Sequence, residues 1–350
     1  GAGGGGDRFP LVSCGADGSV VAWAEGPGGV WGACGGPGKA GGRTLRALAW
    51  APDGGLLAVA GYDACVTVWA PPYAGADADG PWELWATLEG HESEVKGVAW
   101  NASGSMLATC GRDKTVWIWE RVGDPGPKEG DICDFECVEV LQGHEADVKC
   151  LTWHPREDVL VTGSYDGSLR VWCEEEGCGG EWVCTQVIKG EHTVWDVGFE
   201  PGRGLALASC NDEGAVALWA FDPSRARAGS AVSPAARAEG VHSGPAYSLD
   251  WDPVPGAAPP RLATAGADGN LALLRAFVPD GGEEGGAGAP PARLVVDRRI
   301  PAHAPREANC VRWRRAGLPG AAAPGEEGAA LLASAGDDEL VRLWDLPACP

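Results

Sequence analysis

Methionine is almost absent from this sequence. Met106 is the one methionine in 350 residues, and the chain does not begin with it. No run of eighteen apolar residues occurs, which excludes a membrane-spanning helix of ordinary length. The first ten residues, GAGGGGDRFP, lack the charged segment and apolar run of a secretory signal. We therefore expect a fragment of a longer protein that is neither secreted nor inserted in a membrane.

Positive charge is also scarce. The sequence has 27 lysines and arginines against 49 aspartates and glutamates, which gives a formal net charge of −22. Proteins that bind nucleic acids or anionic membranes without specificity need a basic surface. We therefore expect neither nucleic acid nor membrane among the partners.

Motifs for chemistry are missing as well. The sequence contains no GxSxG, P-loop, HExxH or protein-kinase signature. Thirteen cysteines are an odd number, and spacings such as Cys133-x3-Cys137 and Cys173-x4-Cys178 form no paired CxxC knuckles. We expect no enzyme and no bound metal or other cofactor. We also expect a reducing compartment, the cytoplasm, with the nucleus as a second location.

Tryptophan, in contrast, is abundant, with 17 residues, and it marks a repeat. Each copy has Ser/Thr or a small residue, an acidic turn residue, and then alternating apolar residues that end six positions after the acid. The seven copies are VSCGADGSVVAW (12–23), AVAGYDACVTVW (58–69), ATCGRDKTVWIW (108–119), VTGSYDGSLRVW (161–172), ASCNDEGAVALW (208–219), ATAGADGNLALL (263–274) and ASAGDDELVRLW (333–344).

Each copy predicts two strands around a tight turn, because the alternation has a period of two and Asp-Gly favours hairpins. A third strand ending in an aromatic residue precedes most copies, as in VKGVAW (95–100), and a fourth follows, as in ECVEVL (136–141). Four short strands repeated seven times predict an all-β, seven-bladed β-propeller of four-stranded antiparallel blades. We expect residues 1–350 to form a single propeller domain.

Two departures from this regularity are expected. The first copy begins at its second strand and the last stops after its third, so the first strand of blade 1 and the closing strand of blade 7 are missing from the sequence, which leaves 26 of 28 strands. Three segments rich in Ala, Gly and Pro, near 222–240, 279–291 and 316–328, are expected to be disordered insertions.

Cationic and aromatic residues recur at two positions that face the mouth of the central channel in such propellers. One position precedes each turn acid; the other lies four residues before the aromatic end of each first strand. They include Arg46, Tyr62, Lys96, Arg112, Lys149, Tyr165, Trp195 and Tyr247. One interpretation is scattered surface charge. The other is a binding site for a peptide that carries a carboxylate and an aromatic side chain.

The repeat resembles the WD40 family over nearly the whole chain, with Gly90-His91 and Gly143-His144 as its Gly-His signal. The resemblance implies that a His, a Ser/Thr, the turn Asp and the final Trp form a hydrogen-bonded structural set in a blade. The two best sets are His91, Thr109, Asp113 and Trp119, and His144, Thr162, Asp166 and Trp172. Leu274 replaces the Trp in repeat 6 and Glu213 replaces the Asp in repeat 5, so those blades are expected to be held less tightly.

Within that family, LEGHESEVKGVAWNASGSMLATCGRDKTVWIWE (88–120) and ECVEVLQGHEADVKCLTWHP (136–155) resemble the WD40 subunits of cytosolic iron–sulfur protein assembly (CIA). This resemblance implies a non-catalytic scaffold that joins a HEAT-repeat protein and a small adaptor in a targeting complex. The complex delivers iron–sulfur clusters to cytosolic and nuclear apoproteins. It further implies that Arg112 is important and that clients or adaptors bind through C-terminal tails ending in an aromatic residue beside an acid. The alternatives are a ubiquitin-ligase substrate receptor and a chromatin-peptide reader.

Overall fold

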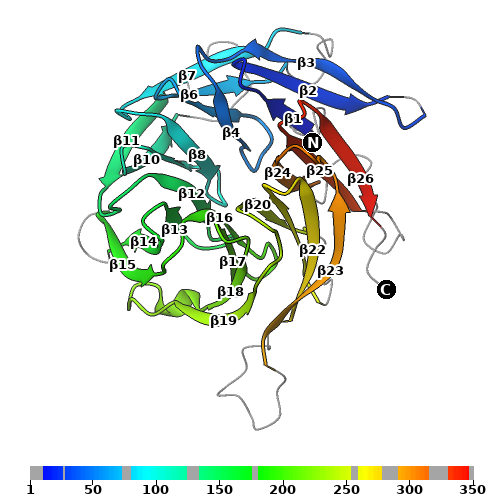
Figure 1. Cartoon of the computed structure of the whole chain (residues 1–350). Coiled ribbons are helices and arrows are strands. Elements are labelled where there is room, and N and C mark those ends of the chain that lie inside the picture. Colours follow the sequence, from blue (N-terminus) through cyan, green and yellow to red (C-terminus); the bar gives the residue numbers. More distant parts are fainter. Residues whose placement is uncertain are drawn as a thin grey trace. The chain divides into compact units, whose positions relative to one another are not determined.

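A computed structural model describes residues 11–26, 28–72, 80–123, 134–175, 180–253, 259–277, 291–314 and 330–346. Within these residues, 26 strands form seven sheets, five of four strands and two of three (Figure 1). The seven-bladed β-propeller class is thereby confirmed. We number the sheets as blades 1 to 7 in chain order. The chain divides into two compact units, unit 1 with residues 1–153 and 176–183, and unit 2 with residues 154–175 and 184–350.

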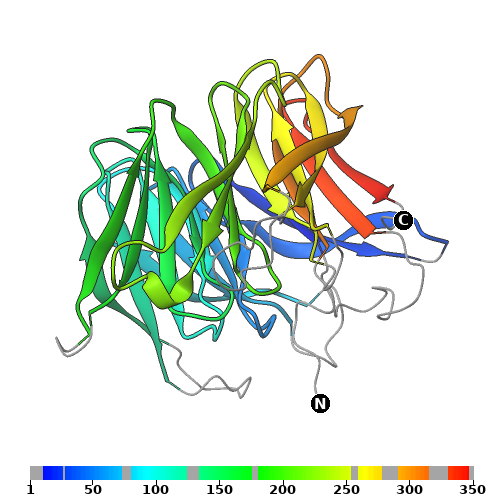
Figure 2. The ribbon, with the colours of Figure 1, turned by 90° about the horizontal axis from the view of Figure 1, so that it is seen from below.

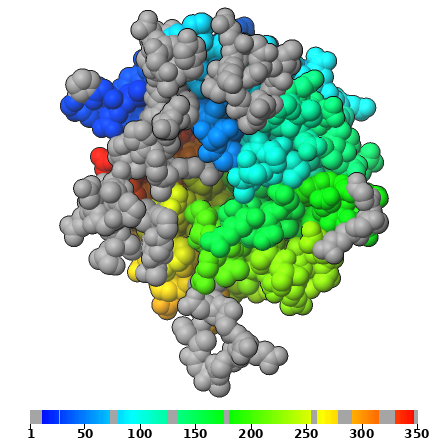
Figure 3. All heavy atoms as spheres, turned by 180° about the vertical axis from the view of Figure 1, so that it is seen from behind, coloured from blue at the N-terminus to red at the C-terminus, as the bar shows by residue number. Residues whose placement is uncertain are grey.

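Blade 1 has three strands, and blades 2 and 3 have four each, all within unit 1. The strands up to the end of unit 1's longer segment are β1 (Leu11–Cys14), β2 (Ser19–Glu25), β3 (Trp31–Lys39), β4 (Leu45–Trp50), β5 (Leu57–Gly61), β6 (Cys65–Ala70), β7 (Glu83–Glu89), β8 (Val95–Trp100), β9 (Met106–Gly111), β10 (Val116–Val122), β11 (Asp134–Leu141) and β12 (Val148–Trp153). Neighbouring strands in these sheets pair antiparallel. Blades 2 and 3 pack against each other through β4 and β8, and their atoms appear in light blue and cyan in Figure 3.

Blades 5 and 6 have four strands and blade 7 has three, all within unit 2. The remaining strands are β13 (Val159–Ser164), β14 (Ser168–Glu174), β15 (Trp182–Lys189), β16 (Val194–Phe199), β17 (Ala206–Asn211), β18 (Val216–Phe221), β19 (Val232–Ala238), β20 (Ala246–Trp251), β21 (Arg261–Gly266), β22 (Asn270–Phe277), β23 (Arg293–Pro301), β24 (Ala308–Trp313), β25 (Ala330–Gly336) and β26 (Val341–Leu346). Figure 2 shows the strands of blade 6 side by side, from yellow to orange. Among the described residues, no helix is long and apolar enough to span a membrane.

In the four-stranded blades the second strand lies in the middle of the sheet and is buried along almost its whole length, as in β5, β9, β13, β17 and β21. The residue at or near the start of the second strand is a leucine with 0 % exposure in six blades: Leu57, Leu107, Leu160, Leu207, Leu262 and Leu332. Burying a leucine side chain stabilises the fold by roughly 1.5–3 kcal/mol. This burial explains why these strands consist almost entirely of apolar and small residues.

The segment 222–240, expected to be disordered, is ordered instead, and that prediction was wrong. Asp222 caps a short 3-10 helix (Pro223–Arg225) by accepting from the Ser224 N–H, and β19 follows as the outer strand of blade 5. Pro234 is tolerated there because it lies at a register shift on an edge strand. One edge of this strand has no neighbouring strand in the sheet that needs a backbone N–H donor. Composition misled the prediction because an edge strand needs few apolar residues. The other two segments lie outside the described residues, except for residue 291.

His154 is a buried histidine of the fold. Its side chain is 1 % exposed, and its ring centroid lies 5.1 Å from that of Phe199 and 5.3 Å from that of Phe221. Nδ1 accepts a hydrogen bond from the Glu157 N–H at 3.0 Å, so the neutral ring serves as an acceptor. Burial lowers the pKa of His154 below its ordinary value, because the charged ring would lose its hydration.

We expect the free energy of unfolding to fall as the pH drops from 7 to 5. A lowered pKa means that the unfolded chain binds more protons than the folded chain in this range, which favours unfolding. His154→Asn keeps an acceptor for the Glu157 N–H and removes the titrating ring, so urea unfolding at several pH values should show a shallower slope. Some slope should remain, because burial also lowers the pKa of His242. An unchanged slope in the variant would contradict this assignment.

Candidate functional site

The second residue of the first strand in most blades is a β-bulge residue. In blade 3, Val95 faces Gly111 and Gly97 faces Cys110, so Lys96 is the extra residue between two pairs. The same register shift occurs at Arg46 in β4. In unit 2 it occurs at Trp195, Tyr247 and Asn309. A bulge kinks the strand and redirects the side chain of the extra residue. Nothing in the sequence pattern predicted these bulges.

The cationic residues of unit 1 lie at the same end of three neighbouring strands. The Trp100 indole of β8 donates to the Ala49 carbonyl of β4 at 3.1 Å, and the Trp153 indole of β12 donates to the Ala99 carbonyl of β8 at 3.1 Å. Each bond joins the last residue of one first strand to the penultimate residue of the preceding first strand, so the strands are in matching register. Their second residues, Arg46, Lys96 and Lys149, therefore share one edge of unit 1.

The residues before the turn acids lie beside this edge. The Tyr62 N–H donates to the Thr44 carbonyl and the Arg112 N–H to the Glu94 carbonyl, both at 2.9 Å, and both acceptors lie just before a first strand. The Lys96 ammonium lies 3.9 Å from the centroid of the Tyr62 ring. A cation over an aromatic face contributes about 0.5–1 kcal/mol at an exposed site. The two predicted positions thus meet within unit 1. We call Arg46, Tyr62, Lys96, Arg112 and Lys149 the basic edge.

Acidic residues partly compensate the basic edge. Arg112 Nη1 lies 3.2 Å from both carboxylate oxygens of Glu94, and Lys149 Nζ lies 3.5 Å from Asp147 Oδ2. The hydrogen bond from Ser93, and then those from the backbone and Arg112, lower the pKa of Glu94 to about 2. The Arg112 side chain is still 60 % exposed. Its Nη2 and Nε have no partner among the residues described, so an incoming carboxylate can bind there bidentately.

In unit 2, the predicted residues form an aromatic pair and one exposed ring. Trp195 and Tyr247 meet edge to face with ring centroids 5.0 Å apart. Burial, followed by the neighbouring Glu307 carboxylate, raises the pKa of Tyr247 to about 12, so the phenol stays protonated. Tyr165 is 59 % exposed. These residues are described within unit 2 alone, and their approach to the basic edge stays a prediction.

The set expected in blade 3 is present as hydrogen bonds. His91 Nδ1 lies 2.7 Å from Asp113 Oδ2, and His91 Nε2 lies 2.9 Å from Thr109 Oγ1. The Trp119 indole donates to the same Thr109 oxygen at 3.1 Å. The set satisfies polar groups that would be costly to bury alone.

In blade 4, the Trp172 indole donates to Thr162 Oγ1 at 2.9 Å, and Asp166 accepts from the Ser168 N–H at 2.8 Å. His144, which belongs to unit 1, is 6 % exposed. Thr162 is 0 % exposed, so its bond to the indole lies in the core.

Two further sets were missed in the sequence. His242 bonds Thr264 at 2.9 Å and Asp268 at 2.9 Å, although Leu274 stands at the Trp position of that blade. In blade 7 the members are His303, Ser334, Asp338 and Trp344. Val241 and Ala302 precede these two histidines, so the Gly-His signal that marks His91 and His144 is absent from the sequence at both places.

An arginine network in unit 2 was also missed. Arg312 Nη1 donates to Ser248 Oγ at 2.8 Å and to the Leu249 carbonyl at 2.9 Å, and it lies 3.4 Å from Asp196 Oδ2. Asp196 also accepts from the Leu249 N–H at 3.0 Å. These contacts join β16, β20 and β24, so Arg312 holds the first strands of three blades together. The sequence signal that could have identified this network is the charged Arg312 within a strand of otherwise mainly apolar residues.

Metal chemistry finds no support in the described residues. No group of three or more His, Cys, Asp or Glu side chains there is placed to hold a metal ion. Burial raises the pKa of Cys173 and Cys210, so these thiols stay protonated and are poor ligands. Cys133 and Cys178 lie outside the described residues.

Comparison with known proteins gives consistent matches. The WD40 model (WD domain, G-beta repeat) matches residues 37–70, 82–120 and 135–173. The chain is 32 % identical to the probable cytosolic iron-sulfur protein assembly protein 1 of Botryotinia fuckeliana, over 86 % of this chain and 84 % of that protein. It is 38 % identical to the probable CIAO1 homolog of Chlamydomonas reinhardtii, over 76 % of this chain and 72 % of that protein.

Coverage of the relatives varies. The match to the probable cytosolic iron-sulfur protein assembly protein 1 of Chaetomium globosum, at 30 % identity, spans 66 % of that protein's length. Among solved structures, the WD40 β-propeller domain of Doa1 superposes with a TM-score of 0.62 at 17 % identity, over 95 % of this chain and 88 % of that one. The likeness to Doa1 shows the fold alone.

Proposed function

We propose a function from the premise that this chain belongs to the WD40-repeat family of cytosolic iron-sulfur protein assembly protein 1. It acts as a non-catalytic scaffold of that machinery in the cytoplasm, with the nucleus as a second location. Its partners are proteins: a HEAT-repeat subunit, a small adaptor, and apoprotein clients that receive iron–sulfur clusters. It binds no cofactor of its own.

The observation that carries the proposal is the basic edge. In a protein with a net charge of −22, four cations and one tyrosine gather at one end of three neighbouring strands of unit 1. Such an edge suits a C-terminal tail that offers a free carboxylate, an acidic side chain and an aromatic ring. Arg112 provides the bidentate donor, and Tyr62, with the aromatic residues of unit 2 as further candidates, provides stacking partners.

The expected binding free energies indicate that one such tail binds weakly. A charge-assisted hydrogen bond contributes roughly 1.5–3 kcal/mol and a buried side chain adds roughly 1.5–3 kcal/mol. After the cost of association, an affinity of about 1 μM is plausible. A client would then need a second contact with the complex to bind firmly.

The proposal is tested by fluorescence anisotropy with a labelled peptide that ends in an acidic residue and a tryptophan with a free carboxylate. We expect Arg112→Glu to weaken binding at least tenfold, because it removes the guanidinium and adds repulsion. Glu94→Gln should tighten binding a few-fold, since it frees Arg112 from its competing carboxylate.

Lys39→Glu is the matched control. It makes the same change of charge in unit 1, on the outer strand β3. It should leave the affinity unchanged. Equal binding by the native protein and by Arg112→Glu would refute the site, whatever the fate of the family assignment. A copurification that returned ubiquitin-ligase adaptors or histones and no iron–sulfur proteins would favour the alternatives.

A further inference from the structure

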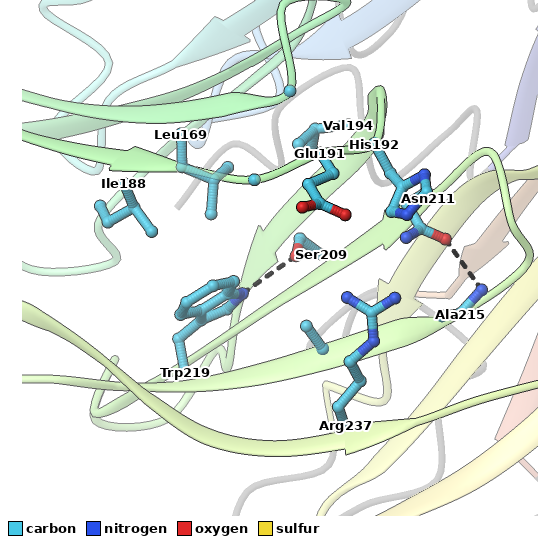
Figure 4. Close-up of a pocket in the computed structure, with 13 residues that line it drawn as sticks. Leu169, Ile188, Glu191, His192, Val194, Ser209, Asn211, Ala215, Trp219 and Arg237 are labelled. Carbon is cyan, nitrogen blue, oxygen red and sulfur yellow. Dashed lines mark hydrogen bonds between the residues drawn. The ribbon is translucent and has the colours of Figure 1, made fainter.

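A small pocket lies in unit 2 beside the hairpin of blade 5, and we call it the blade-5 pocket (Figure 4). It has a volume of about 80 Å³, with apolar walls from Leu169, Ile188 and Trp219 and a single hydroxyl, Ser209, among them. A cavity volume of about 10–15 Å³ accommodates one water molecule. The pocket therefore has room for a group of about five heavy atoms.

The equivalent place in three other blades is filled by a histidine ring of the same blade. In blade 3 the ring of His91 reaches the hydroxyl of Thr109 through Nε2 at 2.9 Å. In blade 6 His242 reaches Thr264, and in blade 7 His303 reaches Ser334, again at 2.9 Å. Ser209 is the corresponding hydroxyl of blade 5, because it accepts from the Trp219 indole at 2.9 Å as Thr109 accepts from Trp119.

Blade 5 lacks this ring because its loop is shorter. His91 lies four residues before Val95, the first residue of its strand, whereas His192 lies only two residues before Val194. His192 therefore stays at the rim, where its Nε2 lies 3.1 Å from the Glu213 carboxylate. The His192 imidazole therefore does not occupy the position beside the hydroxyl that the histidine ring takes in blades 3, 6 and 7.

Asn211 reshapes the pocket further. It stands where five other blades have glycine and blade 4 has Ser164. In blade 6, for example, a Cβ at Gly266 would lie 2.6 Å from Nδ1 of His242. The side-chain oxygen of Asn211 accepts from the Glu213 N–H at 3.2 Å and the Ala215 N–H at 2.9 Å, the task that the turn acid performs elsewhere. The amide oxygen thus faces the turn (Figure 4), and the amide nitrogen, which has no partner among the described residues, faces the other way. Asn211 is only 9 % exposed.

The polar groups of the pocket complement a neutral imidazole. Ser209 Oγ has a lone pair that can accept from a ring N–H, and the Asn211 amide can donate to the other ring nitrogen. Ala217 stands where blade 3 has Trp117, which leaves space above the hydroxyl. The Glu191 carboxylate and the Arg237 guanidinium project into the pocket from opposite sides (Figure 4). Arg237 is paired with Glu239 and lies 3.7 Å from Glu213 Oε2, whereas the Glu191 carboxylate can accept from the N–H of a peptide backbone.

We propose that the blade-5 pocket binds a histidine side chain of a partner protein, which supplies in trans the ring that this blade does not supply itself. This site is separate from the basic edge and does not depend on the proposed function. Its occupant is a neutral five-membered ring with one donor and one acceptor. The Glu191 carboxylate then accepts from a backbone N–H beside that histidine.

The probe for this site is 4-methylimidazole, the histidine side chain without its backbone, titrated into the whole chain. The Trp219 indole N–H resonance, assigned with Trp219→Phe, reports on the pocket because it bonds Ser209. We expect a saturable shift with a millimolar dissociation constant. 1-Methylimidazole has no N–H to donate and should bind at least tenfold more weakly. Ala217→Trp, which copies blade 3, should fill the space and weaken 4-methylimidazole at least tenfold.

His91→Gly supplies the positive control. It opens the equivalent site of blade 3, where Thr109 and Asp113 remain, and 4-methylimidazole should shift the Trp119 indole resonance and raise the thermal midpoint by about 2 °C at ten times the dissociation constant. No saturable shift of the Trp219 resonance in the native chain would overturn the proposal, whether or not His91→Gly folds. A shift that is unchanged in Ala217→Trp would also overturn it.

Discussion

Replacing Asp113 by alanine is expected to lower the free energy of unfolding by about 3 kcal/mol. The carboxylate is 7 % exposed and accepts from His91 Nδ1 at 2.7 Å, from the Glu92 N–H at 3.0 Å and from the Thr115 N–H at 3.1 Å. Alanine leaves three donors in or near the core without an acceptor. The loss comes from these unsatisfied groups rather than from the single ion pair.

This effect depends on pH in a defined direction. Burial alone would raise the pKa of Asp113, but the hydrogen bond and charge of His91 outweigh it and hold the pKa at about 2. A lowered carboxyl pKa stabilises the folded state above the unfolded value of about 3.9, and the contribution is lost as the pH falls through the folded value. The difference between native protein and variant should thus be complete at pH 7 and shrink below pH 4.

Asp17→Ala is the matched control, measured by urea unfolding beside Asp113→Ala. Asp17 is the turn acid of blade 1, but it is exposed, and among the described residues it accepts only from the Ser19 N–H at 3.0 Å. We expect it to cost no more than about 1 kcal/mol. Equal losses in the two variants would mean that the histidine set contributes little to stability.

Gly269→Ala is expected to destabilise the protein by about 3 kcal/mol or more. Gly269 follows the turn acid of blade 6 with φ +72°, and a Cβ there would lie 2.6 Å from the Ala304 nitrogen and 2.7 Å from the Ala304 Cα. These are backbone atoms, so the loop must move as a whole. The cost of overpacking, typically 1–3 kcal/mol, adds to the 1–2 kcal/mol of a left-handed residue with a side chain.

Lys114→Ala separates these two contributions. Lys114 occupies the same turn position in blade 3 with φ +71° and already carries a Cβ. Alanine there changes neither the backbone strain nor the packing, so we expect an effect within about 0.5 kcal/mol. If Gly269→Ala had an equally small effect, the loop before β24 would be able to shift and accommodate the added Cβ, which would contradict this prediction.

The strands were predictable from sequence because each blade repeats the same local rules. Alternation in β9 and β10, with an acidic turn between them, predicts a hairpin without reference to the rest of the chain. The failures lay where local rules are weak. The outer strand β19 packs on one face only, so its composition resembled a loop.

The equivalent positions of the cationic residues in unit 1 were predictable, but their contacts were not. Equal spacing placed Arg46, Lys96 and Lys149 at equivalent positions, and the indole bonds between blades place them on one edge. The ion pair of Arg112 with Glu94 depends on side-chain directions that spacing does not determine. The blade-5 pocket follows from a loop two residues shorter and from Asn211, features that sequence alone presented as an imperfect repeat.

The bulge at the start of the first strands has an evolutionary consequence. Lys96 and its counterparts lie between two cross-strand pairs, so no ladder partner constrains their identity. Selection can exchange lysine, arginine, tryptophan, tyrosine or asparagine at these positions without disturbing the sheet, and this chain contains all five. New binding preferences can thus arise one residue at a time on a framework that does not have to change.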